Sequence, residues 1–240
     1  MTDYLKSTRH PFSSLMFVLP LLIVYEGGVL LLAPQSPSME LRNGADAWVR
    51  SQLVAAGVNF AWTLPILLLA FLCGATAWDW KERPKKQFTA LFGMILESLI
   101  FAVGMWALSR NFLPLLDRVG MPTHSIGFQT PATGQVVRYI GAGIYEEVLF
   151  RLAIFGVLSL LLQVILIPKY VAIPVATLAG ALAFSAAHHL GTSGEAITTP
   201  VFLFRTVAGL LFTALFVGRG LGIAVGTHAG YNILVGVSVG

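Results

Sequence analysis

Runs of apolar residues long enough to cross a lipid bilayer are the feature that most constrains the fold of this chain. A helix needs about 20 predominantly apolar residues to cross the hydrocarbon core. We mark the runs in order as Phe12–Ala33, Leu53–Ala77, Phe88–Leu108, Gly134–Ile167, Val171–Leu190, Val201–Val217 and Leu221–Val239. The fourth run is too long for one upright span, so we expect it to be tilted, kinked, partly interfacial or divided in two.

Composition supports a membrane protein. Hydrophobic residues make up 56% of the 240 residues and charged residues 11%, whereas soluble domains usually carry about 25% charged residues. The apolar runs are continuous and do not alternate, which favours helices over barrel strands. We therefore predict an all-α polytopic membrane helix bundle of about seven, or eight, transmembrane helices. We treat residues 1–240 as one integral membrane domain, with a motif-bearing core at 134–240.

Several functional classes are excluded by the same sequence. The single cysteine, Cys73, excludes a disulfide framework and a cysteine-based metal site within the chain. The net charge of +4 is typical of basic loops facing an anionic leaflet, and the chain has no dense basic tract for nucleic acid. The run Phe12–Ala33 is too long for a signal-peptide core, so we interpret it as an uncleaved first span.

Lysine and arginine in the short connections predict the orientation, because basic loops stay on the cytoplasmic side. With seven spans, one side holds Lys6, Arg9, Lys81, Arg83, Lys85, Lys86, Lys169 and Arg219. The other side holds Arg42, Arg50, Arg110 and Arg118. We therefore predict a cytoplasmic N-terminus in a bacterial inner membrane, with any pocket near His188 opening to the outer face.

Ionisable residues inside a span are costly, so each one is a functional hypothesis. The fourth run contains Tyr145-Glu146-Glu147-Val148-Leu149-Phe150-Arg151. Glu147 and Arg151 are four apart on one helical face and are expected to pair, which leaves Glu146 free to face a cavity. A carboxylate in a low-dielectric site suits a general base. The alternative is a charge pair that joins two helices, with Glu146 as an extra acceptor.

Two further sets of polar residues lie in later runs. His188 and His189 end the fifth run after small residues that allow close helix packing. His228 and Asn232 are four apart in the last run and share a face. The alternatives are an interfacial histidine and an interhelical hydrogen-bonded pair.

Together the three sets provide a base, imidazoles and hydrogen-bond donors, which suffice to activate water and stabilise an oxyanion. His189 and Arg205 are additional candidates, and Arg205 would serve as a counter-ion for a carboxylate. Imidazole and carboxylate also bind zinc, and a divalent metal, if one is bound, would be held by Glu146, His188 and His228. The chain has no HExxH and no GxSxG motif.

The three motifs in this order resemble the CAAX-protease and bacteriocin-processing family, whose relatives include the type II CAAX prenyl endopeptidases. They stand here as Glu146-Glu147-x-x-x-Arg151, Phe184-x-x-x-His188 and His228-x-x-x-Asn232, within about Gly134 to Leu234. The resemblance implies an intramembrane endopeptidase that acts on a membrane-anchored protein or peptide within the lipid bilayer.

The resemblance also implies roles for single residues. Glu146 would activate water and His188 would help to hold it, while His228 and Asn232 would donate to the oxyanion. Glu147 and Arg151 would shape the site. We favour metal-independent hydrolysis without a cofactor and leave zinc as the alternative.

Two functions of other classes remain open. Buried glutamate, histidine and arginine also form proton relays in transporters, although the missing inverted repeat weighs against a proton-coupled transporter. A non-proteolytic member could bind a partner in the membrane as an immunity protein. Glu26 and Glu97, in the first half of the chain, receive no catalytic role.

Overall fold

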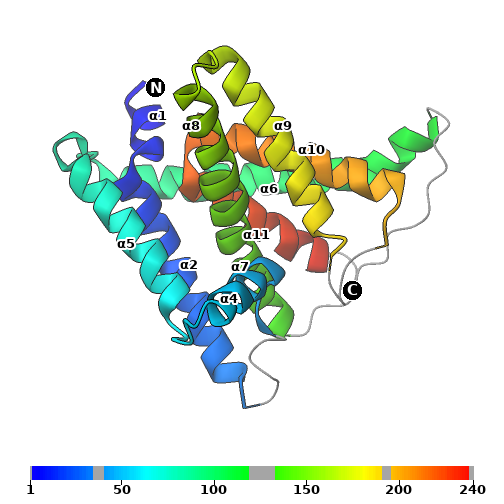
Figure 1. Cartoon of the computed structure of the whole chain (residues 1–240), viewed down its shortest axis with the longest axis horizontal. Coiled ribbons are helices and arrows are strands. Elements are labelled where there is room, and N and C mark those ends of the chain that lie inside the picture. The colour runs from blue at the N-terminus through cyan, green and yellow to red at the C-terminus, as the bar shows by residue number, and fades with distance from the viewer. Residues whose placement is uncertain (1, 35–40, 119–132, 191–195, 238–240) are drawn as a thin grey trace.

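The computed structural model describes residues 2–34, 41–118, 133–190 and 196–237, and these residues form helices and connections without any strand (Figure 1). The elements are α1 (Thr2–Arg9), α2 (Pro11–Leu32), α4 (Gly44–Ala55), α5 (Thr63–Trp78), the 3-10 turn η1 (Trp80–Glu82), α6 (Gln87–Arg118), α7 (Thr133–Glu147), the π-helical segment η2 (Val148–Phe155), α8 (Gly156–Val164), α9 (Lys169–Ala187), α10 (Thr199–Arg219) and α11 (Leu221–Val237). The predicted all-α fold is confirmed for this part of the chain.

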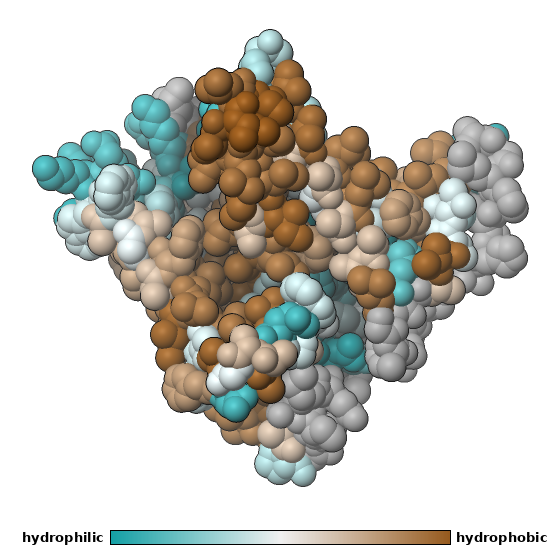
Figure 2. All heavy atoms as spheres, viewed as in Figure 1, coloured by the Kyte–Doolittle hydropathy of each residue, from teal (hydrophilic) through white to brown (hydrophobic). Residues whose placement is uncertain are grey.

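Within the described residues, five helical segments are long and apolar enough to cross a bilayer. They are α2, α6, the continuous run from Gly134 to Val164, α9 and α10, and two shorter apolar helices, α5 and α11, accompany them. Figure 2 shows hydrophobic side chains over most of the visible face, with one group of hydrophilic residues at the upper left and others around α4. The chain is an integral membrane protein.

The second apolar run does not form the single helix expected from Leu53 to Ala77. It is divided between the end of α4 and the whole of α5. Gly57 has a φ of +86°, and the N–H groups of Gly57 and Val58 donate to the carbonyls of Val54 and Leu53. This is the double hydrogen bond with which a glycine in the left-handed region ends a helix. α4 therefore stops inside the apolar run.

The fourth run is one continuous helical segment with a widened turn inside it. α7 leads directly into η2 at Val148, and α8 follows as far as Val164. π-helical turns are rare and occur frequently at functional sites. α6 extends past the expected end at Leu108 to Arg118. Val239, the expected end of the last run, lies outside the described residues.

α11 is the central helix of the bundle, packed against α6, α7, α10 and α2 (Figure 1). Most of its residues are buried, and they include the polar Thr227 and His228. Gly143 of α7 lies so close to α11 that a Cβ placed on it would be 2.8 Å from the Ala229 backbone nitrogen and 2.8 Å from the Val225 carbonyl oxygen. This close approach brings the end of α7 beside the middle of α11.

Replacing Gly143 by alanine should push α7 and α11 apart, because backbone atoms of α11 cannot move aside as a flexible side chain would. We expect the free energy of unfolding in detergent to fall by about 1–3 kcal/mol. Gly104→Ala is the matched control, because a Cβ at Gly104 meets nothing within 4 Å and alanine is the better helix former. Equal stability of the two variants would contradict the close α7–α11 contact.

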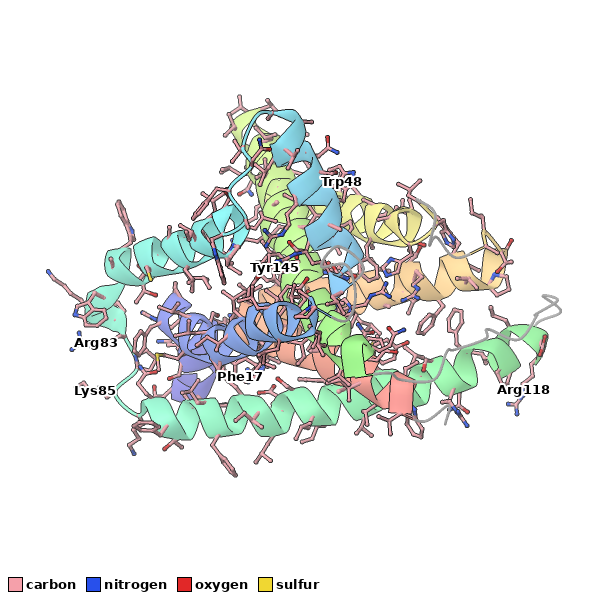
Figure 3. All side chains as sticks on the ribbon, turned by 90° about the horizontal axis from the view of Figure 1, so that it is seen from below. Phe17, Trp48, Arg83, Lys85, Arg118 and Tyr145 are labelled. Carbon is pink, nitrogen blue, oxygen red and sulfur yellow. The ribbon has the colours of Figure 1, made fainter. Side chains whose placement is uncertain are left out.

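Several basic residues, among them Arg9, Arg83, Lys85 and Arg219, gather at one end of the molecule, which we call the basic end. In Figure 3, Arg83 and Lys85 lie at one end and Arg118 at the other, with Phe17 and Tyr145 between them. Arg9 Nε donates to the carbonyl of Gly218 at 2.7 Å, so α1 and the end of α10 also meet at the basic end. Glu97 of α6 joins this region through Arg219, at 2.5 Å, and through the Tyr4 hydroxyl, at 2.9 Å.

Candidate active site

Glu146 is the residue at which three distant parts of the chain meet. It lies at the end of α7 with 8% of its surface exposed. Its Oε1 accepts a hydrogen bond from Asn43 Nδ2 at 2.8 Å. Its Oε2 lies 3.6 Å from Nε2 of His188, after α9, and 3.6 Å from Nε2 of His228, in α11. The structure thus brings Glu146, His188 and His228 together.

Glu147 forms the predicted ion pair and also contacts α11. Its Oε1 lies 3.1 Å from Arg151 Nη1 and 2.7 Å from His228 Nδ1. Glu147 and Arg151 are 0% and 1% exposed. A buried charge is tolerated only when it is paired, and here the carboxylate is shared between a guanidinium and an imidazole.

The Arg151 guanidinium is enclosed by aromatic rings. Its central carbon lies 4.5 Å from the ring centre of Phe184 and 5.2 Å from that of Phe212. Its Nη2 donates to the carbonyl oxygen of Gly209 at 3.4 Å. These contacts hold the Arg151 guanidinium, the partner of Glu147, between α9 and α10.

Hydrogen bonds orient both histidine rings toward Glu146. Nδ1 of His188 lies 2.8 Å from the carbonyl oxygen of Phe184, and Nδ1 of His228 faces the Glu147 carboxylate. Both partners accept hydrogen bonds, so we assign the proton to Nδ1 in each ring. The His228 ring also stacks on Phe212, with centroids 4.4 Å apart. Each ring therefore directs its Nε2 toward the Glu146 carboxylate.

Three other predicted site residues remain: Asn232, His189 and Arg205. Asn232 lies one turn after His228 and is half-buried, and no contact with it is seen from the other described site residues. His189 stacks on Phe202, with ring centroids 5.9 Å apart, on the side of α10. Arg205 lies in the first half of α10 and is partly buried.

Asn43 is the contact of Glu146 that sequence reasoning missed. It lies 103 positions before Glu146, in a segment predicted to be a polar connection. An asparagine followed by an acidic residue three positions later is a helix-start pattern, so the start of α4 could have been found. No local sequence pattern predicts the contact between Asn43 and Glu146.

Four charged residues beside Asn43 form a second buried cluster, which we call the four-charge cluster: Glu26, Arg42, Asp46 and Arg50. Arg42 lies 3.1 Å from Glu26 and 2.7 Å from Asp46, and Arg50 lies 3.2 Å and 2.6 Å from the same carboxylates. Burial opposes the charge of Arg42, but hydrogen bonds to Asp46 and Glu26 outweigh it and raise the Arg42 pKa above its ordinary value. Arg42 therefore keeps its charge within the cluster.

The arrangement of the described side chains bears on metal ligation. Among them, no group of three or more histidine, cysteine or carboxylate side chains is arranged to hold a metal ion. Imidazole and carboxylate are nevertheless ligand types that zinc accepts. Metal-independent hydrolysis stays a prediction.

Comparison with known proteins identifies the segment that carries the site. Residues 128–234 match the family model described as type II CAAX prenyl endopeptidase Rce1-like. The resemblance predicted from the three motifs is confirmed over this segment, which includes Glu146, His188 and His228. No curated protein and no solved structure shows significant similarity to the chain. Asn43 and the four-charge cluster lie outside the matched segment.

Proposed function

We propose that this chain, Rce1-like over residues 128–234, is an intramembrane endopeptidase that hydrolyses a peptide bond with water activated by Glu146. The observation that carries the proposal is the buried Glu146 carboxylate, whose Oε2 lies 3.6 Å from Nε2 of both His188 and His228. A general base must be within hydrogen-bond reach of the water that it deprotonates. We propose that such a water lies between Oε2 and the two histidine nitrogens.

In the proposed reaction Glu146 Oε2 takes one proton from water, and the unprotonated Nε2 of His188 accepts the hydrogen bond from the other. The water oxygen bonds to the carbonyl carbon of the substrate, and the carbonyl electron pair moves to its oxygen. When the carbon–nitrogen bond breaks, the proton on Glu146 passes to the leaving amine. The carboxylate is then restored, so no other reactant is consumed.

His228 and Asn232 would stabilise the oxyanion. Nδ1 of His228 is held by Glu147, so Nε2 donates only when the ring carries both protons. The amide of Asn232, one turn along α11, would provide the second donor. Preorganised donors of this kind contribute strongly when they lie in a site that excludes water.

The membrane arrangement that we propose has seven spans, with α5 and α11 as the two shorter ones. The basic end would face the cytoplasm of a bacterial inner membrane, in accordance with the charge rule for short loops. His188 and Asn43 lie where α9 ends and α4 begins, away from the basic end. The substrate would then be a membrane-anchored protein or peptide reached from the opposite face.

The test compares peptide termini in membranes of cells that make the wild-type protein or Glu146→Gln. We expect at least one membrane-anchored protein to lose a defined cleavage site in the variant alone. Both proteins must be present in equal amounts and must unfold at the same temperature. Identical termini in the two membranes would refute hydrolysis by Glu146 and return weight to a binding or transport function.

A further inference from the structure

Asn43 uses both ends of its side-chain amide. Its Oδ1 accepts hydrogen bonds from the N–H groups of Ala45, at 2.8 Å, and Asp46, at 3.4 Å, and so caps α4. Because Oδ1 is committed to the cap, the amide nitrogen must point the other way. It donates to Glu146 Oε1 at 2.8 Å, which fixes the orientation of the amide group.

The backbone of Asn43 is held as firmly as its side chain. Its N–H donates to the Tyr25 hydroxyl oxygen at 3.1 Å. The Tyr25 hydroxyl in turn donates to Asp46 Oδ2 at 2.7 Å. Asn43 and Asp46 are 8% and 0% exposed. The asparagine is therefore attached to α2 through Tyr25 and to α4 through its cap.

The ion pairs of the four-charge cluster connect the start of α4 to the neighbouring helices. Two guanidinium groups and two carboxylates balance one another, with Glu26 from α2 and Asp46 and Arg50 from α4. The hydroxyl of Tyr145, the neighbour of Glu146 in α7, donates to Glu26 Oε1 at 2.8 Å. The start of α4 is thus fixed against α2 and α7 on the side where Glu146 lies.

We infer that Asn43 is a positioning residue for Glu146, which holds Oε1 so that Oε2 faces the two histidine nitrogens. The inference rests on the proposed role of Glu146 as the base. A carboxylate held at one oxygen keeps the other oriented for proton transfer, and small errors in such geometry lower rates strongly. Asn43 lies outside the family-matched segment, so this part of the site is contributed by the first half of the chain.

Two substitutions separate positioning from capping. Asn43→Ser keeps a good N-cap but is too short to reach Glu146. Asn43→Asp keeps the cap and the shape, and replaces the donor by a carboxylate facing Glu146. We expect kcat to fall about 10- to 100-fold in Asn43→Ser, the value of one hydrogen bond to a charged group, and further in Asn43→Asp. In Asn43→Ser, the variant on which the inference is judged, KM and the unfolding temperature should stay near their wild-type values.

The measurement uses the full-length protein in detergent and a membrane-anchored reporter with the cleavage site mapped in wild-type membranes. Asn59→Ser, at an exposed asparagine in the connection before α5, is the matched control and should cleave at the wild-type rate. Wild-type kcat in Asn43→Ser, with Glu146→Gln inactive, would overturn the inference and leave the proposed function standing. A kcat loss that follows a lowered unfolding temperature would also overturn it. Cleavage by folded Glu146→Gln would refute the proposed function itself.

Discussion

Glu146→Gln is expected to lower kcat by about 10³-fold or more, within the range that general bases contribute, and to leave the unfolding temperature unchanged. Glutamine has the shape of glutamate, and its amide oxygen still accepts the hydrogen bond that Asn43 donates to Oε1. It cannot take a proton from water at neutral pH. The loss would therefore fall on chemistry, and the reporter cleavage rate under saturating substrate measures it.

Glu146→Asp is a control that keeps the carboxylate but shortens the side chain. Its carboxylate is withdrawn by one methylene from the two histidine nitrogens that lie 3.6 Å from Oε2. We expect a rate between those of the wild-type protein and Glu146→Gln, because the base remains but its position is wrong. A folded Glu146→Gln variant that cleaves at a tenth of the wild-type rate would show that another group takes the proton.

Arg151→Ala is expected to give the largest loss of stability, about 3–5 kcal/mol. The substitution removes the guanidinium from Glu147, which is 0% exposed, and leaves that carboxylate with only His228 as an ionic partner. It also opens the space between Phe184 and Phe212 that the guanidinium occupies. The free energy of unfolding, measured by denaturant titration in detergent, tests this expectation.

A double variant separates the structural and catalytic parts of this pair. Glu147→Gln combined with Arg151→Met leaves no unpaired charge and fills the space, so much of the stability should return. Cleavage should stay low, because His228 no longer faces a carboxylate at Nδ1. If Arg151→Ala alone is as stable as the wild-type protein, the ion pair does not stabilise the fold.

The parts of the site that could be predicted from the sequence are those set by local spacing. Residues four apart on a helix share a face, which was sufficient to predict the pairing of Glu147 with Arg151. The order of the three motifs added His188 and His228. The apolar runs likewise predicted the five helical segments that are long and apolar enough to cross a bilayer, because length and hydropathy are local quantities.

The parts that could not be predicted depend on contacts between distant segments or on small backbone features. The hydrogen bond from Asn43 to Glu146 joins residues in α4 and α7 through tertiary packing alone. The division of the second run depends on the left-handed conformation of Gly57, which hydropathy does not detect. The π-helical segment after Glu147 cannot be recognised from its composition, because Val148 to Phe155 are mostly apolar, as in an ordinary buried helix.

The helix at the centre of the bundle, α11, is also the last of the described helices to leave the ribosome. A nascent chain that has inserted α7 and α9 already carries Glu146 and His188, but it has no His228 and no partner for the Glu147 carboxylate on that side. The contacts of α11 with α6, α7, α10 and α2 form only after α11 has been synthesised. Under the proposed mechanism, hydrolysis therefore starts only after synthesis has passed this helix.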